Sequence, residues 1–533
     1  MRLRDYLIQF FIALTVFAIF SIWIRVPGYM DAEYYTLSAT RLATGHGLTQ
    51  PIIWNFLDDP TRLPYASHTY WMPAPSLVAA AGMRISGTTD FSFGRLPFVL
   101  LAALVVPAAS WMGWRLDKTR LTGWLSAGLA VFCGYYVPYS STVDSFFLIM
   151  LGAWLILFLM DGTLADCLPF KPFIWLAFGL ASGWMHLNRA DGFLWLALTA
   201  GFWIHQYIKS GNTSTRQKLI FYGFLLASGY FSATWFWYSR NVVEFGSLFT
   251  PHTSRALWTT NYDELFSYPP EVLTYNHWIT PGWGIILRDR LAALGNNLAA
   301  MVAVQGLVFL FPFCVAGIWN RRHDPLVRMG IGMEIVILLV MSFVFPYSGR
   351  RGGFLHSSAA LQPLIWGLSA AGLADVLKWI APKRNWNAAR SIKMFAPGAI
   401  LLCAITTVFV FQMMVIGNNP MQPLWEESYR DSVTATEMIN KNGIPVSDRI
   451  MINNPAGFSL ISGRESVVIP YGNPQAALEV AEKFKIDYIL LEKNLVSRLM
   501  PLYRQPEKFS AFKVVDRLDD KILLKINQSS GGN

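Results

Sequence analysis

The sequence has 533 residues, of which 53% are hydrophobic and 14% are charged, and its formal net charge is +10. Soluble globular proteins carry about 25% charged residues. The composition therefore excludes a disordered chain, a collagen-like repeat and an ordinary cytosolic enzyme, and it indicates a polytopic membrane protein. Whether the net charge also indicates nucleic-acid binding depends on where the charges lie.

The charged residues are divided unevenly along the chain. Residues 417–533 contain 14 Lys and Arg and 14 Asp and Glu, whereas residues 1–416 contain the other 29 basic and 19 acidic residues. The C-terminal segment thus has the charge content of a soluble domain. We predict a transmembrane domain over residues 1–416 and a small soluble α/β domain over residues 417–533. Its expected strands are RIMINN, SVVIP, YILLE, FKVVD and KILLKI, and its expected helices lie around 432–441, 474–485 and 495–503.

Apolar runs of roughly 17 to 25 residues can cross the hydrocarbon core of a bilayer as helices. The run 75–87 (PSLVAAAGMRISG) is shorter, so we predict an interfacial or re-entrant helix there. Residues 27–94 then form a first long outer loop, and residues 238–296 form a second. About eleven transmembrane helices are predicted, at 7–26, 95–115, 120–138, 142–160, 172–187, 191–208, 218–237, 297–318, 328–346, 355–380 and 395–416.

The basic residues of the short loops predict the orientation of these helices. With the N-terminus inside, the inner loops hold 16 Lys and Arg but only five Asp and Glu. The net charge is therefore a topology signal and gives no support to nucleic-acid binding. We expect a multi-pass protein of the inner (plasma) membrane with a cytoplasmic N-terminus and an extracytoplasmic C-terminal domain. The first apolar run is interpreted as an uncleaved anchor because no small-x-small cleavage site follows it.

The outer ends of the predicted spans contain ionisable residues, which are costly there and commonly functional. Asp31 and Glu33 follow the first span in GYMDAEYY. Two carboxylates at positions i and i+2 cannot share one helix face, but both can line a site from a turn or an extended segment. The alternative is a solvated loop. Asp58 and Asp59 in NFLDDP are ranked lower, as loop residues.

Two further acidic positions begin later spans. Asp144 follows Ser140, Ser141 and Thr142 at the outer end of the fourth span, where an acid also suits the first turn of a helix. The turn Asn188-Arg189-Ala190-Asp191 joins the fifth and sixth spans, and its alternative interpretation is a local Arg–Asp pair.

The segment YSGRRGGFLHSSAALQP (347–363) leads into the tenth span and contains Arg350, Arg351 and His356 beside glycines. Adjacent arginines on the outer side run against the positive-inside trend. Glycine-rich backbone, arginine and a helix N-terminus together favour phosphate binding. The alternative is anchoring of the two arginines among lipid headgroups.

These motifs, in this order, resemble the membrane glycosyltransferases of the GT-C fold. The nearest resemblance is to bacterial relatives of protein O-mannosyltransferases and of the aminoarabinose and undecaprenyl-phosphate-sugar transferases. It covers most of the chain and rests on MDAEYY, TLSATRLATGHGLTQP, YWMPAPSLVAAAGMRISG, SSTVDSFFLIML, HLNRADGFLWL, WFWYSRNVVEFGSLF and FLHSSAALQPL. The acidic pair of the family is often directly adjacent, whereas Ala32 intervenes here.

The resemblance implies a hexosyl- or pentosyltransferase that moves a sugar from a polyprenyl-phosphate donor to an extracytoplasmic acceptor, with inversion. It implies that Asp31 is the catalytic base with Glu33 as its partner, and that Asp144 shapes the site. Some members use a divalent metal, but this sequence has no dense outer cluster of carboxylates and histidines, so we expect no obligatory metal. The rival hypothesis is a transporter or flippase of a lipid-linked sugar. By the same resemblance, the lipid phosphate is assigned to Arg189, Arg350, Arg351 and His356.

Overall fold

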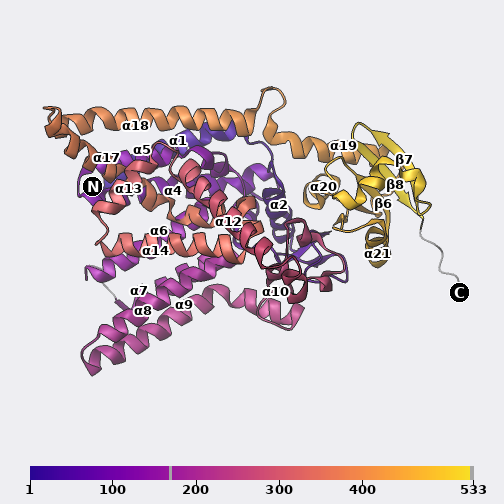
Figure 1. Cartoon of the computed structure of the whole chain (residues 1–533), viewed down its shortest axis with the longest axis horizontal. Helices are drawn as coiled ribbons and strands as arrows, with labels where there is room; N and C mark the ends of the chain where they lie inside the picture. The colour runs from indigo at the N-terminus through magenta and orange to yellow at the C-terminus, as the bar shows by residue number, and fades with distance from the viewer. Residues whose placement is uncertain (167–170, 528–533) are drawn as a thin grey trace.

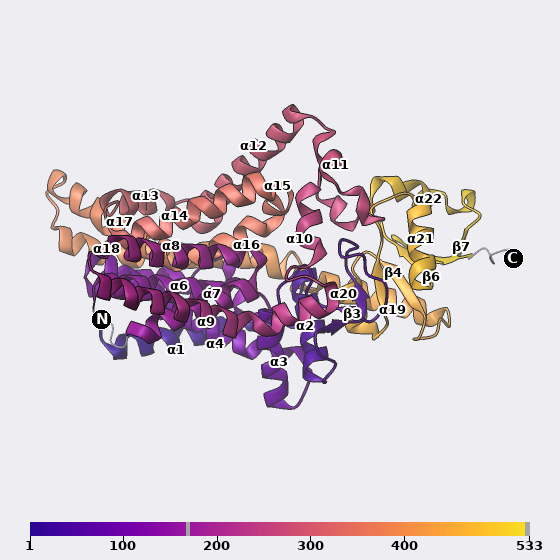
Figure 2. The same cartoon turned by 90° about the horizontal axis from the view of Figure 1, so that it is seen from below.

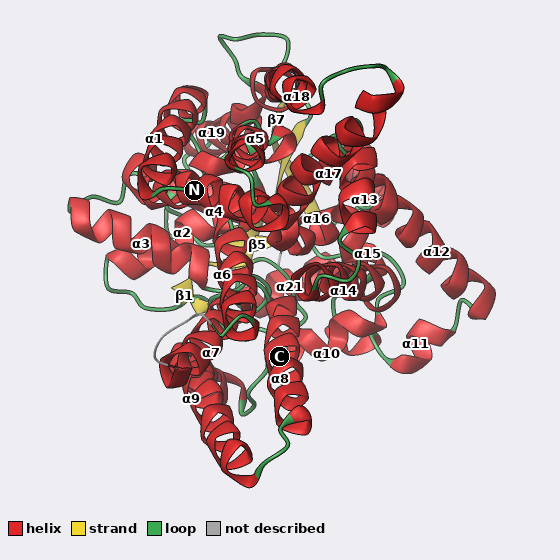
Figure 3. Cartoon of the chain, turned by 90° about the vertical axis from the view of Figure 1, so that its left-hand side faces the viewer, coloured by secondary structure: helices red, strands yellow, loops and turns green. Residues whose placement is uncertain are grey.

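The computed structural model describes residues 1–166 and 171–527, and it divides into a long helical bundle and a sheet at the C-terminal end (Figure 1). The helices run roughly along the long axis of the molecule, and Figure 3 shows them from the bundle end. The bundle contains α1 (Leu3–Phe20), α4 (Phe91–Asp117), α5 (Arg120–Val131), α6 (Phe146–Leu164), α7 (Lys171–Asn188), α8 (Phe193–Lys209), α9 (Thr213–Phe245), α12 (Trp283–Ala300), α13 (Phe311–Asn320), α14 (Pro325–Leu339), α17 (Gln362–Lys383) and α18 (Ala388–Phe411).

Among the described residues, seven helical segments are long and apolar enough to cross a membrane. Four other predicted spans coincide with helices that are shorter or less apolar: α5, α7, α8, and the pair α12 and α13. The predicted span 297–318 is interrupted, because a π-helical turn over Met301–Gln305 and a further turn separate α12 from α13. The seven segments are Leu3–Trp23, Phe91–Asp117, Phe146–Leu164, Thr213–Phe245, Pro325–Val344, Pro346–Lys383 and Ala388–Ile416.

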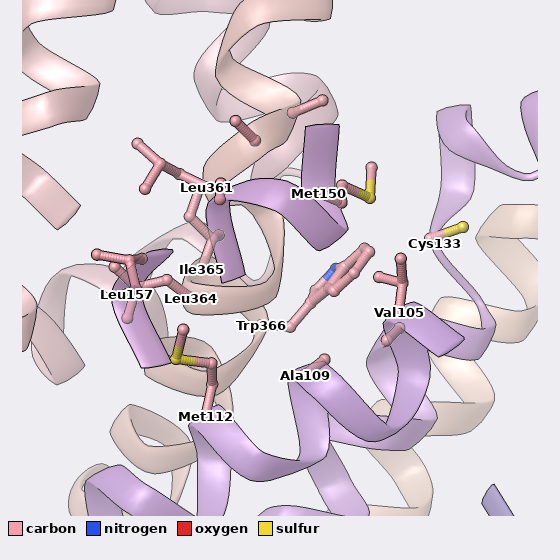
Figure 4. Close-up of a cluster of buried hydrophobic side chains, with 14 of the residues drawn as sticks. Val105, Ala109, Met112, Cys133, Met150, Leu157, Leu361, Leu364, Ile365 and Trp366 are labelled. Carbon is pink, nitrogen blue, oxygen red and sulfur yellow. The ribbon is translucent and has the colours of Figure 1, made fainter. Parts of the chain in front are cut away.

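The centre of the bundle is a close-packed apolar core (Figure 4). Trp366 of α17 is 1% exposed and lies among side chains of α4 and α6, including Val105, Met112 and Met150. Glycines let the backbones of other helices approach: a Cβ atom on Gly372 would lie 1.8 Å from the carbonyl oxygen of Phe313. Small residues at such crossings are typical of membrane helices. The core therefore holds the helices that support the outer end in a fixed arrangement.

Ion pairs connect several helix ends at the end of the bundle where the N-terminus lies. Arg115 pairs with Asp161 at 2.6 Å and with Asp324 at 3.1 Å, and Lys378 pairs with Asp117 at 3.0 Å. These residues come from the ends of α4, α6 and α17 and from the loop before α14. The loops that the charge pattern assigns to the inside thus lie together at one end of the molecule.

The two long outer loops lie at the opposite end of the bundle, next to the C-terminal sheet (Figure 2). The predicted interfacial run 75–87 is helical, as part of α3. The first loop contains α2 (Met30–Ala43), β1 (Thr49–Gln50), β2 (Ile52–Ile53), β3 (Tyr65–Ala66) and α3 (Ala74–Ser86), and the second contains α10 (Pro251–Arg255) and α11 (Tyr275–Ile279).

The C-terminal segment forms a mixed sheet covered by helices on both faces. Its strand order is β2-β5-β4-β6-β8-β7, parallel from β2 to β6 and antiparallel from β6 to β7. The first-loop strand β2 pairs with β5, so the sheet is completed by a segment that lies some 400 residues earlier. The C-terminal elements are α19 (Glu427–Lys441), β4 (Arg449–Ile452), α20 (Pro455–Ser462), β5 (Ser466–Val468), α21 (Pro474–Phe484), β6 (Ile486–Leu491), α22 (Met500–Arg504), β7 (Phe512–Leu518) and β8 (Lys521–Ile526).

Candidate functional site

A cavity of about 400 Å³ opens at the end of the bundle that carries the two long loops 27–94 and 238–296. The first turn of α2, the segment before α3, the turn between α7 and α8, the end of α9 and the bend before α17 surround it. Its size and its mixture of aromatic and polar side chains suit a small polar ligand. Four of the seven predicted site residues line it: Asp31, Arg189, Arg351 and His356.

Asp31 lies in the first turn of α2 and faces the cavity. Burial raises the pKa of its carboxyl group to about 6, and the neighbouring His356 and a hydrogen bond from Trp71 oppose that rise. A carboxylate with a pKa in this range can accept a proton at neutral pH from a group bound in the cavity.

Glu33 does not line the cavity. We expected a turn or an extended segment at Asp31 and Glu33, and that expectation is wrong, because Met30–Ala43 is an α-helix. Residues i and i+2 of an α-helix are about 200° apart around its axis, so the two carboxylates point to different sides. Glu33 instead accepts hydrogen bonds from Ser428 Oγ and Asn454 Nδ2, each at 2.7 Å.

Asp144 lies behind the cavity wall rather than in it. Its carboxylate accepts hydrogen bonds from the hydroxyl group of Tyr29 and from the backbone N–H of Ser145, and it lies 3.5 Å from Nδ1 of His356. The His356 ring also stacks on Phe146, with 3.9 Å between the ring centres. Asp144 and Phe146 together fix the orientation of a histidine that does line the cavity.

Arg189 both makes its local pair and lines the cavity. Its Nε donates to Asp191 at 3.0 Å, and Nη2 lies 3.5 Å from the carbonyl oxygen of Gly353. The alternative of a local Arg–Asp pair is therefore correct, and it coexists with exposure of the guanidinium to the cavity. The contact of Nη2 with Gly353 connects the α7–α8 turn to the glycine-rich bend.

The two adjacent arginines point to different places. Gly349–Gly353 forms a π-helical turn that is interrupted at Gly352, whose φ of 106° favours glycine. Arg351 lines the cavity and lies over the Tyr262 ring, 5.0 Å from its centre. Both arginines are exposed, but Arg350 is not among the lining residues. The sequence gives no reason to assign the two arginines different positions. The backbone conformation of this bend decides which of them lines the cavity.

Several lining residues were not predicted. They come from the two outer loops and from the last turn of α7, next to segments that the sequence did single out. The long outer loop 238–296 and the HLNRAD motif were the signals that could have located them. The additional polar and aromatic residues include Trp71, His186, Asn188, Asn241, His252 and Tyr262.

Asp58 has a supporting position. It is 7% exposed and accepts a hydrogen bond from the backbone N–H of His252 at 2.8 Å. Burial raises the pKa of this carboxyl group to about 6. The contact connects the first long loop to the second.

Within residues 1–166 and 171–527, no group of three or more His, Cys, Asp and Glu side chains is placed to hold a metal ion. The arginines and His356 make the cavity better suited to an anion than to a cation.

No protein-family model matches the chain, and no curated protein matches it. Two solved structures of ArnT from Cupriavidus metallidurans are similar, the apo state with a TM-score of 0.55 at 12% identity and the undecaprenyl-phosphate complex with 0.52 at 13%. Each comparison covers 99% of this chain, and they cover 98% and 99% of the respective ArnT chain.

The oligosaccharyltransferase of Archaeoglobus fulgidus, in complex with Zn and sulfate, is also similar. Its TM-score is 0.54 at 14% identity, over 93% of this chain and 69% of the archaeal chain. Together with the apolar helices, these likenesses show that the chain is a multi-pass membrane protein of the GT-C fold.

Proposed function

We propose that the protein is a glycosyltransferase that uses a polyprenyl-phosphate-linked sugar as donor and an extracytoplasmic hydroxyl or amine as acceptor. The observation that carries the proposal is the convergence of Asp31 with Arg189, Arg351 and His356 around one cavity. Transfer of a sugar from a phosphate needs a base that takes the acceptor's proton and cationic groups that stabilise the departing phosphate. The carboxylate and the cationic side chains of the cavity can fill these two roles. The GT-C fold and the undecaprenyl phosphate bound in one similar ArnT structure support the same chemistry.

In the proposed reaction Asp31 takes the proton of the acceptor group. The acceptor oxygen or nitrogen attacks the anomeric carbon of the donor, and the bond from that carbon to the phosphate oxygen breaks with inversion. The electron pair leaves with the polyprenyl phosphate. Arg189, Arg351 and His356 stabilise the charge that develops on the phosphate, and Asp144 orients His356 through the contact at 3.5 Å.

The proposal includes the topology predicted from the loops. In this proposal the basic loops lie in the cytoplasm together with the N-terminus. With about eleven spans, the C-terminal segment and the cavity next to it then lie on the extracytoplasmic side of the plasma membrane. No reaction step is assigned to a metal.

The test is an assay of the purified full-length protein with polyprenyl-phosphate sugars and candidate acceptors. Release of free polyprenyl phosphate coupled to glycosylation of the acceptor supports the proposal, whereas movement of intact donor across the membrane supports a flippase. The variant Asp31→Asn keeps the shape of the side chain but removes the base, and loss of a general base lowers the rate by about 10²–10⁴-fold.

The matched control for this variant is Asp263→Asn, an exposed acid of the second outer loop that does not line the cavity. It should retain wild-type turnover. Near-normal turnover of the Asp31→Asn protein would show that Asp31 is not the base.

A further inference from the structure

The C-terminal segment contacts the first turn of α2 next to the proposed base. Glu33 is 2% exposed, and its two carboxylate oxygens are shared between two donors of the C-terminal segment. Ser428 Oγ donates to Oε1 and Asn454 Nδ2 donates to Oε2, each at 2.7 Å, and Asn454 Nδ2 lies 3.1 Å from Ser428 Oγ. If Glu33 lost these two donors, its carboxylate would still be buried and would have no partner to offset the cost of desolvation. The two hydrogen bonds therefore favour the position of α2 that keeps Glu33 in contact with Ser428 and Asn454.

The donor atoms are themselves held in place. Oδ1 of Asn454 accepts the backbone N–H of Gly457 at 3.2 Å and so caps α20. The amide group of Asn454 therefore cannot rotate by 180° without losing the cap. Gly457 fits closely against the carboxylate, since a Cβ atom there would lie 2.7 Å from Glu33 Oε2.

A second contact lies just before α2. The indole of Trp425 donates to the backbone oxygen of Val26 at 3.0 Å and meets the Tyr29 ring edge-on, with 5.6 Å between the ring centres. A Cβ atom on Gly28 would lie 2.2 Å from the Trp425 ring. Tyr29 in turn donates to Asp144. The C-terminal segment thus touches the chain on both sides of Asp31.

We infer that Glu33 is a positioning residue through which the C-terminal segment sets the place of Asp31. The C-terminal segment is then needed for the geometry of the site. Glu33 affects catalysis only through the position of α2. This inference rests on the proposed function for its kinetic consequence. Its structural consequence, the fixing of the first turn of α2, is independent of any activity.

The test is a swap of the two hydrogen-bonding groups in the full-length protein. In Asn454→Asp two carboxylates face each other, and Glu33→Leu has no acceptor, so each of these changes breaks the contact. Glu33→Gln alone keeps it, because the amide oxygen can accept from Asn454 Nδ2 and the amide nitrogen can donate to Ser428 Oγ. In the double variant Glu33→Gln/Asn454→Asp, the amide at position 33 donates to the carboxylate at 454. That carboxylate can still accept the Gly457 N–H.

We expect Asn454→Asp and Glu33→Leu each to lower kcat by about 10²-fold, the loss that a misplacement near 1 Å causes. Glu33→Gln alone should stay within about tenfold of wild type, because it keeps both hydrogen bonds. The KM for the polyprenyl-phosphate donor should change less than threefold, because the cationic groups are untouched. The double variant should recover kcat to within about tenfold of wild type, a coupling that independent sites do not show. The matched control is Glu437→Gln, an exposed acid on the same α19 as Ser428, which should behave as wild type.

Hydrogen–deuterium exchange supplies the readout that does not depend on activity. Exchange over residues 30–36 should rise in Asn454→Asp and Glu33→Leu and return toward wild type in the double variant Glu33→Gln/Asn454→Asp, with α4 unchanged. Unchanged exchange and kcat in Asn454→Asp would overturn the inference. A double variant as impaired as Asn454→Asp would also overturn it, because a carboxylate that acts directly must stay at position 33. Should the wild-type protein lack transferase activity, the proposed function fails, while the exchange experiment still decides the role of Glu33.

Discussion

The carboxyl group of Asp31 determines the expected pH dependence. Burial raises its pKa to about 6, and a general base works only when it is deprotonated. We therefore expect kcat/KM for the donor to be constant above about pH 7 and to fall by about tenfold per pH unit below pH 6. The measurement is a profile of kcat/KM for the donor from pH 4.5 to 8. A flat profile between pH 5 and 8 would contradict the role of Asp31.

The neighbouring arginines give a matched pair of variants. Both are exposed, but Arg351 lines the cavity and Arg350 is not among the lining residues. A hydrogen bond to a charged group contributes about 1.5–3 kcal/mol, so Arg351→Gln should raise the KM for the donor by about 10- to 100-fold. Arg350→Gln should leave it within twofold of wild type. Equal effects of the two variants would indicate a role in headgroup anchoring that the two arginines share.

For single residues, the sequence could identify candidates for the site but could not predict the direction of their side chains. Asp31, Arg189 and His356 were found because ionisable groups at the outer ends of spans are costly and rare. Glu33 and Arg350 were nominated on the same grounds, yet they point elsewhere. Their direction depends on the helical phase of α2 and on the bend at Gly352, which are properties of the backbone.

At the scale of helices, the contact between α13 and α17 depends on a glycine. A Cβ atom on Gly372 would lie 1.8 Å from the Phe313 carbonyl oxygen, so Gly372→Ala must push the helices apart. Overpacking of a core costs about 1–3 kcal/mol, and we expect a lower midpoint of thermal unfolding in detergent. Gly398→Ala on α18 is the control, because no atom lies within 4 Å of the added Cβ. An unchanged midpoint for Gly372→Ala would show that the contact yields easily.

The positions of most helices could be predicted, but their lengths and breaks could not. Long apolar runs indicate helices because a chain in lipid must satisfy its own backbone hydrogen bonds. The predicted span 297–318 is divided between α12 and α13, and the run of apolar residues does not reveal this break. It arises where a π-helical turn interrupts the regular backbone hydrogen bonds of the helix. Gln305 lies in this turn, and its Nε2 donates to the backbone oxygen of Ser358, before α17.

For the whole molecule, the loop charges make a prediction about orientation. We expect a cysteine at Gly211, in the loop between α8 and α9, to be inside, and a cysteine at Lys513, on β7, to be outside. Both positions are exposed. In a background without the four native cysteines, a membrane-impermeant thiol reagent should label Lys513→Cys in sealed right-side-out vesicles. It should label Gly211→Cys only after permeabilisation. The reverse pattern would invert the topology.

The sequence by itself determined the composition of the protein, the approximate places of its helices and strands, and a set of candidate residues at one end of the spans. These are local or periodic properties. They are visible in the sequence because a helix that crosses a bilayer needs an apolar run of a certain length. Only the tertiary structure decided that β2 of the first loop joins the C-terminal sheet and that Glu33 contacts Ser428 and Asn454. Such contacts join residues some 400 positions apart, and no local pattern records them, because each partner alone is an ordinary polar or apolar residue.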